Sequence, residues 1–374
     1  MSIFRSIVLG LYLAACAAST RADTTVATNT IIRVMAANLT SGSAQSYEAP
    51  GIRIFQGLKP DIVAIQEFNY GDKSATAIRS FVDTAFGTNY SYFRESGSGY
   101  TIPNGVISRY PIKSSGSWVD VDAGVNDRGF AWGQIDLPGT NDLYVVSVHL
   151  KASSGSDNPA RRYAQATNLW NLIAANFPAN AWIVVAGDCN IYDPSELAYQ
   201  YLAVNLSDTP IPTDTNTVAG GDADTNLGRS ERYDYVFPSR SLTNHMVATG
   251  LPSQTFSKGL VFDSRIYKPL ADVFPVQAGD SEVTGMQHMA VVRSFSIPYL
   301  VTVTNAVPPP VVRMRSAQMI EWTGPSNMVY RVESRSDLAS TSWTTLGTAT
   351  STSTNYSFTV ETGFDRAFFR VAYP

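Results

Sequence analysis

The sequence predicts an α/β protein that carries a small all-β module at its C-terminal end. Short apolar runs alternate with amphipathic stretches from Ile31 to Pro298, which is the pattern of an α/β domain. A Pro-Pro-Pro segment at residues 308–310 marks a boundary, and short apolar and aromatic runs follow it. The length of 374 residues agrees with two domains, since a domain has roughly 150 residues.

Composition excludes two classes of protein. A hydrophobic content of 44% is enough to bury a core, so the chain is not globally disordered. The net charge of −4 excludes a protein that holds nucleic acid by bulk positive charge, although it leaves room for a local cationic site. Charged residues make up only 16%, and Ser, Thr, Asn and Gly replace them, as is common in exported proteins.

Residues 1–22 are predicted to be a secretory signal peptide. Arg5 precedes an apolar run from Ile7 to Ala18, and small residues continue to Ala22. The run is too short to span a bilayer, and no later segment is a candidate for a membrane helix. Cleavage near Ala22, which we favour, would release a secreted or periplasmic protein. The string that ends at Cys16 also resembles a lipobox, which would leave a lipid-anchored protein at the cell surface.

The body of the chain, residues 30–298, is predicted to contain buried strands and two amphipathic helices. The strands are short and rich in β-branched or aromatic residues, and they are Ile31–Ala37, Asp61–Ile65, Leu143–Val148, Trp182–Ala186 and Tyr233–Phe237. Helical spacing of apolar residues predicts helices over Ala75–Phe86 and Ala160–Phe177. Asp208–Gly228 is predicted to be a long polar loop, and loops of that length are usually functional or mobile.

Residues 299–310 are predicted to be a proline-rich linker, and residues 311–374 a small β-sandwich-like module. Its expected strands are Met319–Trp322, Val329–Glu333, Trp343–Leu346, Tyr356–Val360 and Phe368–Val371. The module has no histidine and no cluster of acids, so we assign it no chemistry. It serves either in surface anchoring or glycan contact, or as a stabilising or sorting appendage.

Polar side chains follow several of the predicted strands. They are Asn38, Glu67, His149, Asp188 and Asn190, each at the end of an apolar run. A strand that is buried to its last residue and then presents such a group directs that group to the rim of its sheet. Asp188 and Asn190 point to one side if the chain stays extended. For any one of these residues, a role as a turn former is the better explanation, so the indication comes from their number.

The three histidines help to identify which polar residues belong to a functional site. His149 ends one apolar run and His288 begins another, whereas His245 lies in a Thr-Asn-His-Met context that indicates a structural or surface role. Asp234 lies inside an aromatic strand, where a buried carboxylate needs a partner. A histidine partner would form a general acid/base pair, and a salt bridge to Arg232 or to another arginine is the alternative.

These motifs, in this order, resemble those of the endonuclease/exonuclease/phosphatase superfamily, which has the deoxyribonuclease I-like fold. The resemblance covers roughly Ile31–Ile297 and includes a strand–turn segment at Pro103–Ile112. The matching motifs are Asn38, Gln66-Glu67, Ser147-Val148-His149-Leu150, Gly187-Asp188-Cys189-Asn190, Arg232-Tyr233-Asp234-Tyr235-Val236 and His288. The resemblance implies a four-layer α/β sandwich of two packed, mainly antiparallel sheets flanked by helices. It also implies divalent-metal-dependent hydrolysis of phosphate esters.

Roles follow from the same resemblance. Glu67 matches the metal-binding carboxylate and Asn38 the amide beside it, and such oxygen ligands suit Mg²⁺ or Mn²⁺. Asp188 matches the acid that orients or deprotonates the attacking water, and Asn190 the amide that hydrogen-bonds the phosphate.

The histidines and two further residues also acquire roles in this way. His149 and His288 would flank the scissile group, with Asp234 orienting His288. Arg128 occupies the position of a phosphate-contacting basic residue, and Tyr100 is expected to line the site.

One position departs from the family pattern. The family usually has an Asp before the C-terminal histidine, and this chain has Gln287 there. Loss of a carboxylate should weaken metal binding and lower the pKa of the neighbouring histidine. Asp280 and Glu282 are candidates to compensate. Gln287 therefore leaves open whether one or two metals bind, and whether the enzyme is weak.

The leading hypothesis is an exported, monomeric, metal-dependent phosphodiesterase with nuclease-like activity, because secreted members of the family often degrade DNA. A sphingomyelinase-like or inositol-phosphate-directed enzyme is the second hypothesis, since the low positive charge suits a small phosphoester or a lipid headgroup equally well. A third hypothesis, from another class, is a catalytically weak protein that binds a surface or a glycan, and Gln287 supports it.

Overall fold

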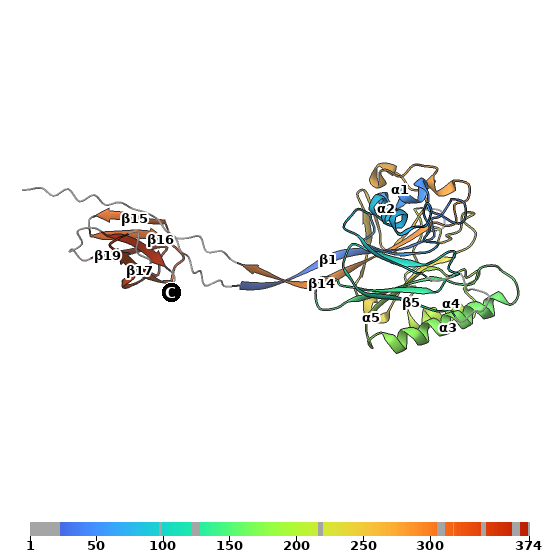
Figure 1. Cartoon of the computed structure of the whole chain (residues 1–374), viewed down its shortest axis with the longest axis horizontal. Helices are drawn as coiled ribbons and strands as arrows, with labels where there is room; N and C mark the ends of the chain where they lie inside the picture. Colours follow the sequence, from blue (N-terminus) through green and yellow to red (C-terminus); the bar gives the residue numbers. More distant parts are fainter. Residues whose placement is uncertain are drawn as a thin grey trace, which may run out of the picture. The chain divides into compact units, whose positions relative to one another are not determined.

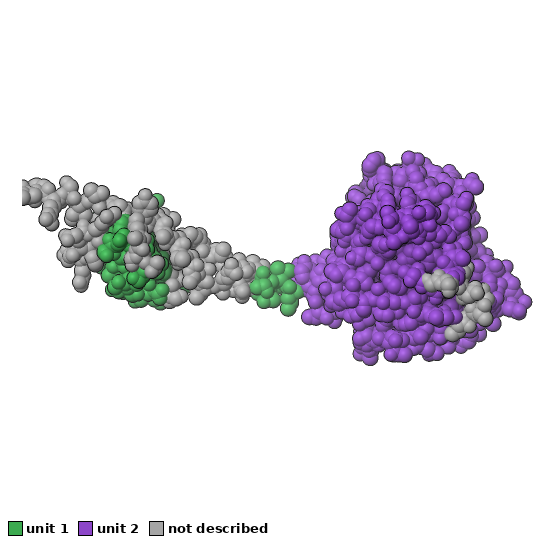
Figure 2. Space-filling view, viewed as in Figure 1, with its two compact units in different colours: residues 1–27, 300–374 green, residues 28–299 purple. Residues whose placement is uncertain are grey.

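The computed structural model describes residues 23–96, 99–120, 128–215, 220–304, 311–316, 318–337, 342–360 and 367–372. The predicted signal peptide at residues 1–22, which includes Cys16, lies outside this described part, as do residues 305–310 of the predicted linker. Residues 28–299 form one compact unit, and residues 1–27 and 300–374 are assigned to the other (Figure 2).

The first sheet of the larger unit is mixed. Its order is β10-β14-β1-β2-β4-β3, with β13 also paired to β14. The strands are β1 (Asp23–Ala37), β2 (Ile62–Ile65), β3 (Ser91–Arg94), β4 (Gly105–Ser108), β10 (Met246–Val247), β13 (Leu260–Phe262) and β14 (Ala290–Thr304). β1 and β2 run parallel with Ala37 opposite Ile65, so the residues that follow both strands emerge at the same edge.

The second sheet has the order β5-β6-β7-β8-β9. Its strands are β5 (Ile112–Trp118), β6 (Phe130–Ile135), β7 (Leu143–His149), β8 (Trp182–Asp188) and β9 (Asp234–Pro238). β7 and β8 are parallel, whereas β8 and β9 are antiparallel. The end of β7, the end of β8 and the beginning of β9 therefore meet at one edge.

The two sheets pack face to face between two layers of helices (Figure 1). α1 (Ala49–Leu58) and α2 (Ala75–Ala85) cover the first sheet, and α3 (Asn158–Asn176) and α4 (Leu197–Asn205) cover the second. Val145 and Val184 point into the core shared with the first sheet, whereas Val146 and Val185 point into the core under α3 and α4. This period-two alternation buries both faces of the second sheet. The predicted four-layer α/β sandwich is confirmed.

Short elements complete the larger unit. They are α5 (Arg240–Thr243), the paired strands β11 (Thr249–Leu251) and β12 (Gln254–Phe256), and the 3₁₀ turns η2 (Leu270–Val273) and η3 (Asp280–Glu282). The predicted loop Asp208–Gly228 contains no α-helix or β-strand among its described residues. It is nevertheless anchored, because Asp208, Asp214 and Thr225 are buried.

Observed elements differ from the expected ones mainly at their ends. β1 begins eight residues before the expected Ile31, and β9 begins at Asp234 and not at Tyr233. β14 continues to Thr304, so residues 299–304 of the predicted linker are strand. Such shifts are ordinary, because strand ends depend on partners that are distant in the sequence.

The C-terminal part of the chain contains two three-stranded antiparallel sheets, β15-β16-β19 and β18-β17-β20. The strands are β15 (Val311–Ser316), β16 (Met319–Thr323), β17 (Val329–Arg335), β18 (Thr344–Thr350), β19 (Asn355–Thr359) and β20 (Phe368–Ala372). Trp322, Tyr330 and Tyr356 lie in its core, with Trp322 and Tyr356 stacked at 5.5 Å. The sequence did not indicate β15, because Arg313 and Arg315 interrupt its apolar pattern.

Candidate active site

Three site residues stand side by side on the second sheet because of its register. His149 is opposite Asp188 across β7 and β8, and Asp188 is opposite Asp234 across β8 and β9. Each is the terminal residue of its strand at this edge. All three are buried, at 4%, 2% and 0% exposure respectively, so their charges interact at short range in a poorly solvated environment.

The first sheet contributes residues to the same place. Asn38 follows β1 and Glu67 follows β2, and both side chains are 1% exposed. Glu67 has a φ of 50°, a left-handed conformation that is uncommon for this residue type and that occurs more often at functional sites. His288 precedes β14, and its backbone N–H donates to the carbonyl of Asn38 at 3.1 Å. Register in both sheets thus brings the six residues to one edge.

Hydrogen bonds connect the contributions of the two sheets. The amide of Asn38 donates from Nδ2 to Glu67 Oε1 at 3.2 Å and to Asp188 Oδ2 at 3.3 Å. His149 Nε2 lies 3.2 Å from Asp188 Oδ2. Asp188 is therefore the residue on which the amide and the imidazole converge.

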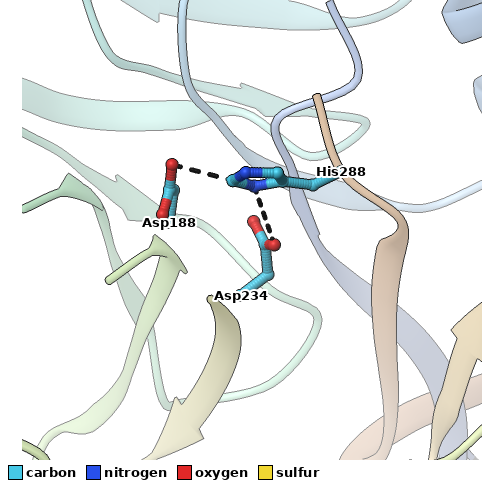
Figure 3. Close-up of side chains that lie close together, drawn as sticks. All are labelled: Asp188, Asp234 and His288. Carbon is cyan, nitrogen blue, oxygen red and sulfur yellow. Dashed lines mark ion pairs between the residues drawn. The ribbon is translucent and has the colours of Figure 1, made fainter. Parts of the chain in front are cut away.

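His288 lies between two carboxylates, as Figure 3 shows. Its Nδ1 is 2.9 Å from Asp234 Oδ2 and 3.7 Å from Asp188 Oδ2. Burial alone would lower the pKa of His288, but Asp234 and Asp188 outweigh it and raise the pKa to about 9. In the metal-free site His288 is consequently a cation at neutral pH.

The two carboxyl groups respond in opposite directions. Burial acts to raise the pKa of Asp188, but the adjacent His288 and His149 hold it below its ordinary range. Burial raises the pKa of Asp234, and the attraction of His288 only partly opposes this effect. Asp188 is thus the more strongly ionised acid and the weaker base of the two, which suits a carboxylate that orients water by accepting a hydrogen bond.

The cluster fits a divalent cation. Glu67, Asp188 and Asp234 bring three buried carboxyl groups against the one protonated imidazole of His288, and a cation would neutralise the excess negative charge. Asp188, Asp234 and His288 each place a potential ligand atom within 4.8 Å of the others, and His288 would have to lose its proton to serve as a ligand. Within the described residues, Asp234 Oδ1 and His149 Nδ1 are buried without a hydrogen-bond partner, which indicates polar groups that a ligand would satisfy.

Asn190 is placed differently from the simple expectation. Its φ of 47° turns the chain, so Asp188 and Asn190 do not continue one extended strand. The backbone N–H of Asn190 donates to Asp188 Oδ1 at 2.9 Å, which orients that carboxylate. Its side chain donates to the carbonyl of Leu150 at 3.2 Å.

Arg128 lies against the backbone at the end of β7, and Tyr100 is half-buried. Arg128 is buried and donates from Nε to the carbonyl of His149 at 2.7 Å and from Nη2 to that of Leu150 at 3.0 Å. Its observed contacts thus support the backbone at the end of β7. Tyr100 is half-buried, and among the described residues no hydrogen bond or ring contact links it to the cluster.

Gln287 does not replace the missing carboxylate. Its amide donates to the carbonyl of Gly285 at 3.4 Å. Asp280 is 1% exposed and is held by Arg53, and Glu282 is exposed. Neither therefore takes the place of an acid at position 287 in this arrangement.

The structure shows one site residue that the sequence did not indicate, and it identifies the partner of Asp234. Thr225 accepts the backbone N–H groups of Tyr233 and Asp234 at 2.9 Å and donates to Asp234 Oδ2 at 2.7 Å. Nothing in its polar loop marks it in the sequence. The alternative partner of Asp234 also proves wrong, because Arg232 forms a bidentate pair with Asp208 at 2.6 and 2.7 Å.

The chain was compared with known protein sequences and solved structures. No curated protein sequence matches the chain. The catalytic domain of human Nocturnin with a bound sulfate is 16% identical and covers 75% of this chain and 98% of its own, with a TM-score of 0.48. An endonuclease/exonuclease/phosphatase from Beutenbergia cavernae DSM 12333 is 16% identical, covers 92% of both chains and has a TM-score of 0.44. An AP endonuclease from Archaeoglobus fulgidus is 15% identical, covers 71% of this chain and 99% of its own, and has a TM-score of 0.45.

The family model is the finding that assigns the chain. It matches residues 38–257, which is more than half of the sequence and includes Asn38, Glu67, His149, Asp188 and Asp234. With this match and the four-layer sandwich described above, the chain belongs to the endonuclease/exonuclease/phosphatase family.

Proposed function

We propose that the protein is an exported, divalent-metal-dependent phosphodiesterase with nuclease-like activity. Members of its family hydrolyse phosphoester bonds. The observation that carries the proposal is the convergence of Asn38 and Glu67 from one sheet with His149 and Asp188 from the other. Such a buried group of acids, amide and imidazoles suits the activation of water beside a phosphate.

Asp188 acts on the attacking water in this scheme. Its Oδ1 is held by the backbone N–H of Asn190, and its Oδ2 faces His149 Nε2 and Asn38 Nδ2. A carboxylate held on both oxygens keeps its orientation, and its lowered pKa keeps it ionised at neutral pH. It can therefore align a water molecule by accepting a hydrogen bond from it.

His288 and His149 act on the phosphate oxygens. His288 Nδ1 lies 2.9 Å from Asp234, which raises the pKa of His288 and favours its protonated form, and a protonated His288 can donate to a phosphoryl oxygen as charge develops there. His149 Nε2 lies 3.2 Å from Asp188 Oδ2, the oxygen that also faces His288, and in this proposal it contacts the phosphate as well. The two imidazoles thus flank the position of the scissile phosphate.

Glu67 and Asn38 would hold a Mg²⁺ or Mn²⁺ ion, since both offer oxygen ligands. When bound, the ion would supply Lewis-acid stabilisation of the phosphoryl charge. Gln287 contributes no carboxylate, so we propose one metal ion and not two. The same residue supports a second candidate function from another class, a catalytically weak protein that binds a surface or a glycan, because Gln287 brings no charge to the site.

Turnover of a substrate panel tests the proposal. Purified protein with Mg²⁺ or Mn²⁺ is assayed on plasmid DNA, RNA, sphingomyelin, an inositol phosphate and a chromogenic phosphodiester. We expect EDTA and Glu67→Ala to reduce turnover below detection, and the exposed Glu282→Gln to leave it unchanged. Undiminished turnover in Glu67→Ala would refute the metal assignment, and a silent panel with tight polysaccharide binding would favour the second candidate.

Export is a separate part of the proposal, supported by the pattern of residues 1–22. In the described residues no helix is both long and apolar enough to cross a membrane. Mass spectrometry of the mature N-terminus in secreted and membrane fractions tests it. A start after Ala22 is expected, a lipid-modified Cys16 would indicate anchoring, and an unprocessed chain retained in the cell would contradict export.

A further inference from the structure

Two tyrosines form an aromatic shelf beside the candidate active site. The ring of Tyr233 lies 5.5 Å from that of His288, and the ring of Tyr192 lies 4.8 Å from that of Tyr233. Both tyrosines are half-buried, and their ring planes are tilted by 57° to one another. The shelf therefore begins next to the group that we expect to contact phosphate.

The shelf is held in place from below. Arg162 is fully buried, forms a bidentate pair with Glu196 at 2.8 Å, and lies over the ring of Tyr192 at 5.2 Å. The backbone N–H of Tyr192 also donates to Glu196 at 3.0 Å. Tyr233 is fixed through its own N–H to Thr225 Oγ1 at 2.9 Å. Rings that are already ordered lose little entropy on binding a ligand.

The two rings are not required to fill a core. Tyr235, two residues further along, is 1% exposed and stacks on Phe237 under the outer helices. Neither Tyr192 nor Tyr233 belongs to the cores formed by the described residues. Large aromatic side chains left half-open beside a polar site are typical of ligand contacts.

The geometry points to Tyr192 and Tyr233 as a subsite for a nucleobase attached to the scissile phosphodiester. This inference rests on the proposed function and gives it a substrate class. Every nucleobase has a planar face that stacks on aromatic side chains, whereas a glycerol or inositol group has none. The overall charge of −4 disfavours binding through many phosphates, which makes a short or single-stranded substrate that stacks its bases the better fit.

Two unactivated phosphodiesters provide the test: a thymidine dinucleotide, which has rings, and glycerophosphoglycerol, which has none. Hydrolysis is followed by ³¹P NMR with Mg²⁺ or Mn²⁺. We expect Tyr192→Leu and Tyr233→Leu each to lower kcat/KM for the dinucleotide by about 5- to 100-fold, mainly through KM. Glycerophosphoglycerol should change by less than about twofold, and Tyr192→Phe and Tyr233→Phe should retain dinucleotide activity, because a ring remains.

Tyr163→Leu is the matched control, since Tyr163 lies on α3 and packs on Tyr201 in the outer helical layer. It should change neither substrate. Equal losses on both substrates in the shelf variants, or no loss at all, would overturn the subsite.

Binding separates a failed subsite from a failed enzyme. If the wild type hydrolyses neither substrate, titration calorimetry with thymidine 5′-monophosphate and glycerol phosphate still measures whether the shelf binds a nucleobase. Tighter binding of the nucleotide, lost in Tyr233→Leu, would uphold the subsite while the proposed function fails. Equal affinity for the two ligands would overturn the subsite itself.

Discussion

Replacing Asp234 by Asn tests the electrostatics of the site most directly. The change keeps the shape of the side chain and removes the carboxylate that lies 2.9 Å from His288 Nδ1. Asp234 is the strongest of the interactions that raise the pKa of His288 from 6.5 to about 9, and burial opposes them. Asp188 remains, so we expect the pKa of His288 to fall by about 1 to 2 units in Asp234→Asn, where one unit corresponds to about 1.4 kcal/mol.

The same shift predicts how stability depends on pH. Since the folded-state pKa lies above the unfolded value of 6.5, protonation of His288 stabilises the native state fully below about pH 6.5, and this stabilisation is lost as pH rises through about 9. The difference corresponds to about 3 kcal/mol. In Asp234→Asn the decline in the free energy of unfolding between pH 7 and 9 should be smaller.

Proton NMR of the histidine rings in EDTA measures the pKa directly, because the chain has only three histidines. His245→Gln removes one of the three signals and so assigns it. The ring of His245 packs on Trp182 at 4.7 Å, and neither side chain belongs to the site cluster. Urea denaturation across the pH range gives the stability. A His288 pKa that stays near 9 in Asp234→Asn would refute the reasoning.

Two further predictions concern the scaffold that holds the site. Gly187 has a φ of 136°, and a Cβ at this position would clash with the carbonyl oxygen of Val148. Gly187→Ala should therefore lower the melting temperature by several degrees and reduce activity. Gly250→Ala is the control and should change neither quantity, because a Cβ there would have no atom within 4 Å. Leu169→Ala should lower the free energy of unfolding, measured by urea denaturation, by about 2–5 kcal/mol, because Leu169 is fully buried on the inner face of α3. The exposed Leu197→Ala is its control, and equal effects of the two would contradict this packing.

Much of the site could be predicted from the sequence, because each polar residue directly follows the apolar run that forms its strand. Glu67, His149 and Asp188 each follow a run of apolar residues that must be buried, so their place at a sheet edge follows from the run itself. The order of these motifs also gave the family, which the match to residues 38–257 confirms. The roles of the individual residues remain predictions for mutagenesis.

Other features depend on contacts between segments far apart in the chain. Arg232 and Asp208, which are 24 residues apart, pair with one another and leave Asp234 to His288. Thr225 gains its role only because a polar loop folds back on β9. Hydrophobic periodicity does not predict such partners, because hydrogen bonds between polar side chains depend on which groups the folded backbone brings together.

The sequence alone determined which segments become strands and which polar groups end them, since hydrophobic periodicity acts within a few neighbouring residues. Tertiary structure decided the strand register that sets His149, Asp188 and Asp234 in one row, and the packing that brings Glu67 and His288 against them. It also placed the rings of Tyr192 and Tyr233 beside His288. A slip of one residue in register turns every side chain of a strand to the opposite face, so the site exists only where long-range pairing has fixed that register.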